Sequence, residues 1–194
     1  HKMNLHFNDY GNLSDNKFKL EKQLEKASKE NDVIITTGGV SVGEADYMKE
    51  ALSNIGKVLF WKMAIKPGRP MAFGKIKKSF YFGLPGNPVS AAVTFLQFVK
   101  PSIKLMMGNF QFESTPILEA KLGQKIIRKK GRTEFVRAYL QKTVKGYCVK
   151  PLNQQGSGML KSMSDANCFI LMAEKEDVLE KNTYVKVILF DGLI

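Results

Sequence analysis

Two glycine-rich stretches are the first features of this sequence that could do chemistry. Gly38–Gly43 and Gly83–Pro88 each follow a short apolar run and precede a helical pattern. Backbone N–H groups at such strand-to-helix junctions bind anions, and glycine lets a ligand approach the backbone closely. Neither stretch has the G-x-G-x-x-G or P-loop spacing. The two stretches predict an anion site of another kind, and a purely structural turn remains the alternative for each.

Two lysines and an arginine lie between these stretches. Lys62 and Lys66 flank Met63-Ala64-Ile65, and Arg69 lies in the following loop between two prolines. Lys62 interrupts an apolar strand pattern, and a buried charge needs a partner or a ligand because leaving it unpaired is costly. The prolines restrict the loop and would hold Arg69 for contact with an oxyanion. We therefore expect these three cations to bind an anionic ligand.

Asp46 lies three residues after Gly43, near the start of a predicted helix. A carboxylate at this place could hold Mg²⁺ or a ring N–H of a ligand. The alternative is an acid in the first helical turn that complements the helix dipole, worth less than about 1 kcal/mol. The residue type and its position leave both interpretations open.

The first 112 residues alternate helical and strand patterns. A helix with apolar residues at i, i+4 and i+7 begins after Asp15 or Asn16. The continuous apolar run Val33–Ile35 is typical of a strand covered on both faces of a parallel sheet. Strand, glycine loop and helix then recur, which predicts a doubly wound α/β domain. The further expected elements are a helix over Met48–Ile55 closed by Gly56, strands at Val58–Ile65, Met71–Phe73 and Phe80–Phe82, and a helix begun by Asn87 and Pro88 and ended by Gly108.

Residues 113–194 carry a different pattern, of short alternating stretches without a long helix between them. Their spacing of roughly 12–18 residues predicts a small β-barrel or sandwich. The domain boundary is expected near residue 112, in a polar linker. The predicted strands are Ile117–Leu122, Phe135–Leu140, Tyr147–Leu152, Phe169–Met172 and Tyr184–Phe190.

Composition limits the function classes. Thirty Lys+Arg against 18 Asp+Glu give a net charge of +12, which favours anionic partners or describes a solvated lysine-rich surface. The basic residues are spread along the chain without an RNA-binding aromatic motif or a zinc finger, so we expect no specific nucleic-acid binding. The sequence contains no run of eighteen apolar residues, so no membrane span is predicted. Cys148 and Cys168 are too few for a disulfide framework, which favours the cytoplasm, and no chemistry is assigned to them or to the two histidines.

Six motifs in order along the chain resemble the MoeA/gephyrin family of molybdenum insertases. The likeness covers nearly the whole chain from about residue 15. The motifs are DVIITTGGVSVGEADY (32–47), FWKMAIKPGRPMAFG (60–74), GLPGNPVS (83–90), GRTEFVR (131–137), QGSGML (155–160) and ANCF (166–169).

The resemblance implies a fold and an activity. The fold would be a MogA-like α/β domain, incomplete at its N-terminus, followed by the family's small C-terminal β-domain. The family inserts molybdate into adenylylated molybdopterin with release of AMP, requires Mg²⁺ or a similar divalent ion, and works as a homodimer. The resemblance therefore implies molybdopterin and molybdate as substrates and a role in molybdenum cofactor biosynthesis.

The motif matches and the residue patterns together give a set of site residues. Asp46, Lys62 and Lys66 match positions that the family uses for activity, and Asp46 is also the expected metal ligand. Asp15 is a further acidic candidate on looser flanking sequence. The predicted ligand-binding residues are Gly38, Gly39, Ser41, Gly43, Arg69, Pro85, Gly86, Asn87, Pro88, Arg137 and Ser157.

The sequence departs from the family pattern at its front. The opening strand with its Thr-Gly-Asp-Glu-Leu-type motif and the two N-terminal domains of the family are absent, and the chain does not begin with methionine. We therefore expect a part of a longer protein that lacks insertase activity on its own. The alternatives are a non-catalytic, gephyrin-like interaction scaffold and, less favoured because of the β tail, a molybdopterin adenylyltransferase.

Overall fold

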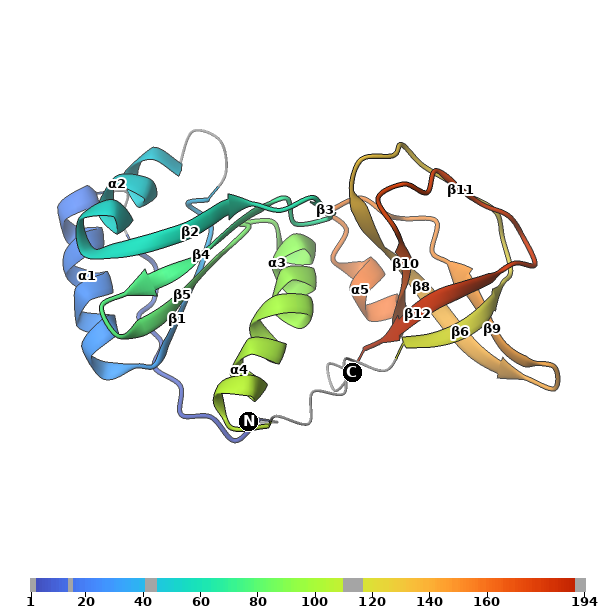
Figure 1. The fold of residues 1–194 in the computed structure, drawn as a ribbon, viewed down its shortest axis with the longest axis horizontal. Helices are drawn as coiled ribbons and strands as arrows, with labels where there is room; N and C mark the ends of the chain where they lie inside the picture. The colour runs from blue at the N-terminus through green and yellow to red at the C-terminus, as the bar shows by residue number, and fades with distance from the viewer. Residues whose placement is uncertain (1–2, 14–15, 41–44, 110–116, 191–194) are drawn as a thin grey trace. The chain divides into compact units, whose positions relative to one another are not determined.

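The computed structural model describes the chain except residues 1–2, 14–15, 41–44, 110–116 and 191–194, and for residues 45 and 46 it describes the backbone alone. The described residues form two compact units (Figure 1). The first consists of His1–Met63 with Pro70–Gly86, and the second of Ala64–Arg69 with Asn87–Ile194. The expected boundary near residue 112 lies outside the described residues, so the division into 1–112 and 113–194 stays a prediction.

The first unit is built on one sheet. Within the described residues its strand order is β1 (Val33–Thr37), β5 (Ser79–Leu84), β4 (Pro70–Ile76) and β2 (Gly56–Lys62). β1 and β5 are parallel, whereas β5, β4 and β2 are antiparallel neighbours. The predicted α/β class is confirmed.

Two helices complete this unit. α1 (Lys17–Glu30) and α2 (Ala45–Ile55) lie side by side (Figure 1). Asn16 caps α1, because its side-chain oxygen accepts a hydrogen bond from the Lys19 N–H at 3.1 Å. Both helices carry the predicted apolar faces. The core includes Leu20, Leu24, Ala27, Met48, Ala51, Leu52 and Ile55.

The expectation that β1 is covered on both faces is wrong. Its pattern of burial alternates, and Ile35 is 41% exposed. Within the described residues β1 pairs with β5 alone, so it is an edge strand. A continuous apolar run predicts a strand but does not say how many layers cover it.

Gly56 does not close the preceding helix in a left-handed turn. It begins β2, where a Cβ atom would come within 2.3 Å of the Lys75 carbonyl oxygen on β4. Glycine is required here by the close approach of two strands. The run Val58–Ile65, predicted as one strand, is likewise divided: β2 ends at Lys62, and Ile65–Lys66 form a separate short strand, β3.

The second unit begins with a helix in three consecutive segments. These are α3 (Pro88–Thr94), the π-helical turn η1 (Phe95–Val99) and α4 (Lys100–Met106). The π turn directly precedes Pro101, whose lack of an N–H disturbs the α-helical hydrogen-bond pattern. Gly108, at φ 81°, follows the end of the helix as predicted. The apolar residues Val89, Val93, Leu96 and Val99 of this helix are all buried.

Five strands of the described C-terminal region close into a barrel. They are β6 (Ile117–Leu122), β8 (Thr133–Thr143), β9 (Gly146–Pro151), β10 (Cys168–Met172) and β12 (Tyr184–Leu189), and pairing between β10 and β8 closes the ring. All five predicted strands are confirmed, and the structure selects the barrel over the sandwich. β3 adds to this barrel by pairing in parallel with β8. Three short elements join it: β7 (Ile126–Ile127), β11 (Val178–Leu179) and α5 (Lys161–Asp165).

The buried Tyr81 makes the first unit sensitive to high pH. Its hydroxyl forms a 2.8 Å hydrogen bond with the Thr36 hydroxyl, and burial raises the pKa of Tyr81 from 10.0 to about 12. The neutral phenol therefore stabilises the folded state fully below pH 10, and this contribution is lost as pH rises through about 12. We expect the free energy of unfolding to fall by roughly 2–3 kcal/mol across this window. Urea unfolding followed by fluorescence of the single tryptophan, Trp61, measures it.

The matched variants are Tyr81→Phe and Tyr47→Phe, because Tyr47 is an exposed tyrosine of the same unit. Tyr81→Phe should flatten the alkaline part of the stability profile, whereas Tyr47→Phe should leave it unchanged. Equal pH profiles for the Tyr81→Phe variant and the unmutated chain would contradict the assignment.

Candidate functional site

The two glycine stretches meet at one edge of the first unit's sheet. β1 and β5 are parallel neighbours with Thr37 opposite Leu84, so both strands end together. The Gly38 N–H donates a 3.0 Å hydrogen bond to the Leu84 carbonyl, and a Cβ on Gly86 would lie 3.4 Å from the Gly38 Cα. The two stretches therefore lie next to each other at one edge of the sheet. The Gly38 amide itself is used within the fold.

Gly83 belongs to the strand and not to the loop. It lies in β5, where an added Cβ would come within 2.7 Å of the Tyr81 hydroxyl and 2.8 Å of the Val40 Cγ1. Its role is therefore close packing beneath the loop. Of the residues that follow it, Pro85 is buried and Gly86 is exposed to solvent.

A cavity of about 740 Å³ lies beside the end of β1. Gly38 and Gly39 line it, together with Tyr47 and Met48 of α2 and the segment Phe7–Leu13. Gly38 and Gly39 have φ values of 85° and 68°, in the left-handed region that favours glycine. The predicted residues Ser41 and Gly43, the further candidate Asp15 and the side chain of Asp46 lie outside the described residues.

Lys62 is not a buried lysine. It is the last residue of β2, opposite Pro70, and its side chain is exposed. The reason for expecting a ligand there, the cost of a buried charge, does not apply. Its match to the family motif remains the support for a role.

Several predicted residues lie in the second unit. Arg69 and Pro88 are exposed, and Asn87 caps α3 with its side-chain oxygen 3.4 Å from the Ser90 N–H. The bend after the cis Lys66–Pro67 peptide packs tightly, because a Cβ on Gly68 would lie 2.6 Å from the Thr94 Cγ2. Asn87 therefore has a structural role, whereas the side chain of Arg69 is exposed to solvent.

Arg137 on β8 is fully buried. Its Nη2 donates to the carbonyls of Gln154 at 3.3 Å and Gly156 at 3.2 Å. Its Nε and Nη1 have no hydrogen-bond partner among the described residues. Burial lowers the pKa of Arg137, and the charge of Glu134 partly opposes this. Two donors of this buried cation therefore lack a partner among the described residues.

Gln155 ties the loop carrying Ser157 to Arg137. Its Oε1 accepts from the Arg137 N–H at 3.0 Å, and its Nε2 donates to the carbonyls of Arg137 at 2.8 Å and Leu152 at 2.7 Å. Ser157 is exposed and follows the Gly156 carbonyl that accepts from Arg137. Gln155 was not predicted as a site residue. Its position in the Gln-Gly-Ser-Gly motif was the available signal.

Glu134 is the second residue that the sequence did not point to. It is buried on β8, and its Oε1 lies 3.0 Å from the Lys66 Nζ. Both residues line a cavity of about 310 Å³ with Arg128, Arg132 and Gln155. The predicted Lys66 is therefore held by a partner that lies 68 positions further along the chain.

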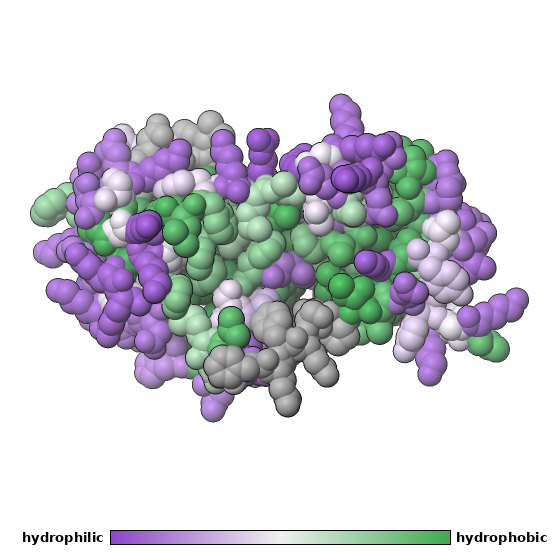
Figure 2. Space-filling model, in the orientation of Figure 1, coloured by the Kyte–Doolittle hydropathy of each residue, from purple (hydrophilic) through white to green (hydrophobic). Residues whose placement is uncertain are grey.

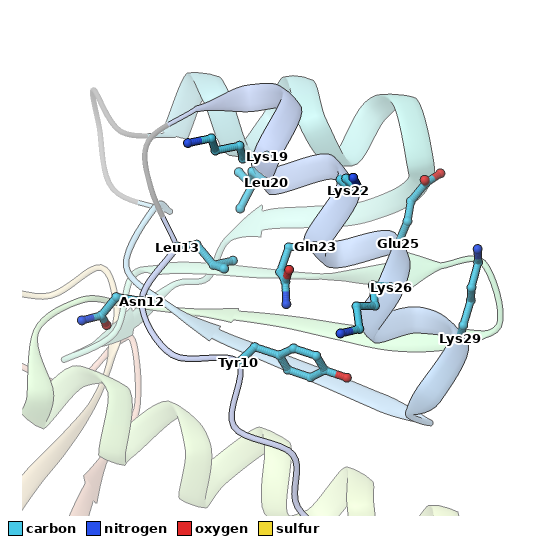
Figure 3. A pocket seen from close by; sticks show the side chains of 10 residues that line it. All are labelled: Tyr10, Asn12, Leu13, Lys19, Leu20, Lys22, Gln23, Glu25, Lys26 and Lys29. Carbon is cyan, nitrogen blue, oxygen red and sulfur yellow. The ribbon is translucent and has the colours of Figure 1, made fainter.

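A third pocket lies along α1 and contains none of the predicted residues. Figure 3 shows Lys19, Lys22, Lys26 and Lys29 coming from α1, with Tyr10 from the segment before it. On the face shown in Figure 2, hydrophilic side chains are spread over both units and do not gather in one patch.

The described part of the chain contains neither a cluster of metal-binding side chains nor a membrane-spanning helix. No three side chains of His, Cys, Asp or Glu lie together there in a way that could hold a metal ion. None of its helices is both long enough and apolar enough to pass through a bilayer. Both cysteines are free, and burial raises the pKa of Cys168 to about 12.

Comparison with known proteins gives two family matches. Residues 1–105 match the model described as a probable molybdopterin binding domain, and residues 119–190 match the MoeA C-terminal region, domain IV. A molybdopterin molybdenumtransferase of Haemophilus influenzae is 39% identical over 187 residues, which is 96% of this chain and 46% of that protein. A gephyrin of Dictyostelium discoideum is 34% identical, over 92% of this chain and 28% of that protein.

Solved structures agree with these matches. The crystal structure of a molybdopterin biosynthesis MoeA protein from Pyrococcus horikoshii aligns with a TM-score of 0.73 at 30% identity, over 92% of this chain and 42% of that one. A molybdenum cofactor biosynthesis protein from Pyrococcus furiosus gives the same TM-score at 27% identity, over 93% of this chain and 57% of that one. The chain thus spans between 28% and 57% of the length of these four relatives.

Proposed function

The chain belongs to the MoeA/gephyrin family, and on that premise we propose that it acts in molybdenum cofactor biosynthesis, as part of a molybdopterin molybdenumtransferase. The reaction would insert molybdate into adenylylated molybdopterin and release AMP. Molybdate, the pyrophosphate link and the pterin dithiolene are all anionic. A protein that handles them needs fixed cationic donors at the binding site.

One observation carries this proposal: the buried guanidinium of Arg137, with Nε and Nη1 free of partners among the described residues. An unmatched buried donor costs about 1–3 kcal/mol, so folding this arginine inward is unfavourable unless an acceptor arrives. A guanidinium offers a planar fork that matches a tetrahedral oxyanion. Ser157, in the loop that Gln155 ties to Arg137, would add a hydroxyl donor.

The remaining predicted residues would hold the other anionic groups of the substrates. Lys62 and Lys66 supply ammonium groups for phosphate or molybdate oxygens, and Arg69 a guanidinium. The loops at Gly38 and Gly86 would let a phosphate approach the backbone at the ends of β1 and β5, the edge where ligands bind in open α/β sheets. Anchoring both substrates lowers the entropic cost of their reaction.

The proposed divalent ion has limited support among the residues present. Asp46 is one carboxylate, and the described residues contain no cluster of three side chains that could bind a metal ion. Mg²⁺ can be held by one carboxylate when substrate phosphates supply further oxygens. Bound there, it would neutralise phosphate charge.

The proposal extends to the assembly and the compartment of the longer protein. We propose a homodimer, as the family resemblance implies. The two free cysteines agree with a reducing compartment, and we propose the cytoplasm.

Calorimetric titration of the 194-residue chain with molybdate, with and without Mg²⁺, tests the function. We expect a saturable heat for molybdate and no conversion of adenylylated molybdopterin by the chain alone, because it spans about half the length of its relatives. Absence of a specific heat would contradict molybdate binding and favour an interaction scaffold. Conversion by the chain alone would overturn the expected inactivity.

A further inference from the structure

Among the described residues, Glu134 carries the one carboxylate that is buried. It lies near the start of β8, is 6% exposed, and places Oε1 3.0 Å from the Lys66 Nζ. Taking a carboxylate out of water is costly unless cations and hydrogen bonds compensate it. A buried acid beside a lysine of the proposed site therefore calls for an explanation.

The second carboxylate oxygen of Glu134 lies near an arginine. Its Oε2 lies 3.8 Å from Nη1 of Arg128 and has no hydrogen-bond partner among the described residues. Arg128 is itself held in place, since its guanidinium donates to the carbonyls of Arg132 and Ala173. The carboxylate is therefore confined between an anchored guanidinium and the Lys66 ammonium.

Lys66 needs such a partner because the element that carries it is small. β3 consists of Ile65 and Lys66, and its parallel pairing with β8 places Lys66 opposite Glu134. A lysine side chain has a long flexible stem whose ammonium is otherwise free to move. Lys66 remains 47% exposed, so donors of the ammonium that do not face Glu134 can reach a ligand.

We propose that Glu134 is a positioning residue, which holds the Lys66 ammonium where it binds the oxyanion of the substrate. This inference rests on the proposed function. It gives β8 a role in placing two cations of the site: Lys66 through the carboxylate of Glu134, and Arg137 because β8 carries it. Glu134 acts through Lys66 and makes no contact with the substrate.

A double-mutant cycle on molybdate binding tests this, with affinities measured by calorimetry for the unmutated chain, Glu134→Gln, Lys66→Ala and the double variant. Removing a negative charge near an anion site should by itself strengthen anion binding. Loss of positioning should instead weaken it, by about fivefold for Glu134→Gln. In the Lys66→Ala background the same change should cause no loss. A tighter or unchanged affinity for Glu134→Gln alone would overturn the proposal, as would an equal loss in both backgrounds.

Two controls separate positioning from folding. Glu180→Gln removes one charge from an exposed ion pair of the same unit, with Lys125, and should leave the affinity unchanged. Glu134→Asp keeps the charge and should recover part of the affinity, and thermal melting monitors the fold of each variant. If Glu134→Gln melts early and Glu134→Asp recovers stability without recovering affinity, positioning is excluded.

The side-chain ammonium signal of Lys66 in a lysine-labelled NMR spectrum gives a readout that does not depend on molybdate. We expect a resolved signal in the unmutated chain that disappears in Glu134→Gln and returns in Glu134→Asp. A chain that shows this pattern but binds no molybdate would contradict the proposed function while leaving the contact intact. A chain that binds molybdate with equal affinity in Glu134→Gln would contradict the inference alone.

Discussion

Replacing Arg137 with methionine is expected to lower the affinity for molybdate by about 100-fold. Each hydrogen bond from a charged donor contributes about 1.5–3 kcal/mol, and Nε and Nη1 are the two donors available to a ligand. Their loss removes about 3 kcal/mol, and each 1.4 kcal/mol corresponds to a tenfold change in affinity. Methionine is chosen because it fills the same buried space without donors. Calorimetric titration with molybdate measures the effect.

The same substitution should not unfold the chain. Apolar replacement of a buried charge that lacks full hydrogen bonding is often neutral or stabilising, so we expect an unchanged or raised melting temperature. Lys142→Met is the matched control, because Lys142 is an exposed cation on the same strand. An Arg137→Met variant that binds molybdate as tightly as the control would contradict the role of the guanidinium.

Replacing Phe169 with alanine is expected to destabilise the barrel by about 3–5 kcal/mol, the usual cost of deleting a buried aromatic ring. Phe169 is fully buried on β10 and contacts Phe135 and Phe190, with ring centroids 5.9 and 4.4 Å apart. It also pairs directly with Arg137 across the β10–β8 ladder. The cavity would therefore lie beside the proposed anion donor, and we expect weaker molybdate binding as well.

Hydrogen exchange of the β8 and β10 amides under urea measures this loss locally. Trp61 lies in the first unit, so its fluorescence transition should stay unchanged. Tyr139→Ala is the control, since Tyr139 is an exposed aromatic residue of β8. A similar loss of stability for Phe169→Ala and Tyr139→Ala would show that the ring contacts of Phe169 contribute little to the stability of the barrel.

Local patterns predicted most of the elements. The caps at Asn16 and Asn87, the apolar spacing of α1 and the alternation in the barrel strands depend on neighbours in sequence, and they are found where expected. Closure of the barrel follows from pairing between β10 and β8, which no local pattern contains. The sequence alone therefore could not distinguish a barrel from a sandwich.

The failures have a common cause in long-range contacts. Gly56 looks like the end of a helix, but its lack of a side chain serves the close approach of β4. Val33–Ile35 looks doubly covered, but its exposure depends on how many layers of the fold pack on the sheet. Lys62 looks buried because its neighbours are apolar, although it ends a strand at the surface. Sequence spacing predicts the periodicity of a segment and not its surroundings.

The site was likewise predictable only in part, because some of its features follow from general rules and others from long-range contacts. Parallel strands end at the same edge, so the meeting of the Gly38 and Gly86 loops followed from a general rule. The burial of Arg137, its clamp by Gln155 and the pairing of Glu134 with Lys66 follow from register between distant segments. No signal short of the motif resemblance could have revealed them.

The joining of β3 to β8 has a consequence for how this protein can be divided and recombined. A gene fusion or exchange that cut the chain in the stretch 110–116 would separate the barrel from the two residues Ile65 and Lys66 that extend it. A transplanted barrel would keep its closed ring but lose the lysine that comes from upstream. The barrel is therefore not a self-contained module, and any exchange that preserves its β3 strand would have to carry residues 65 and 66 with it.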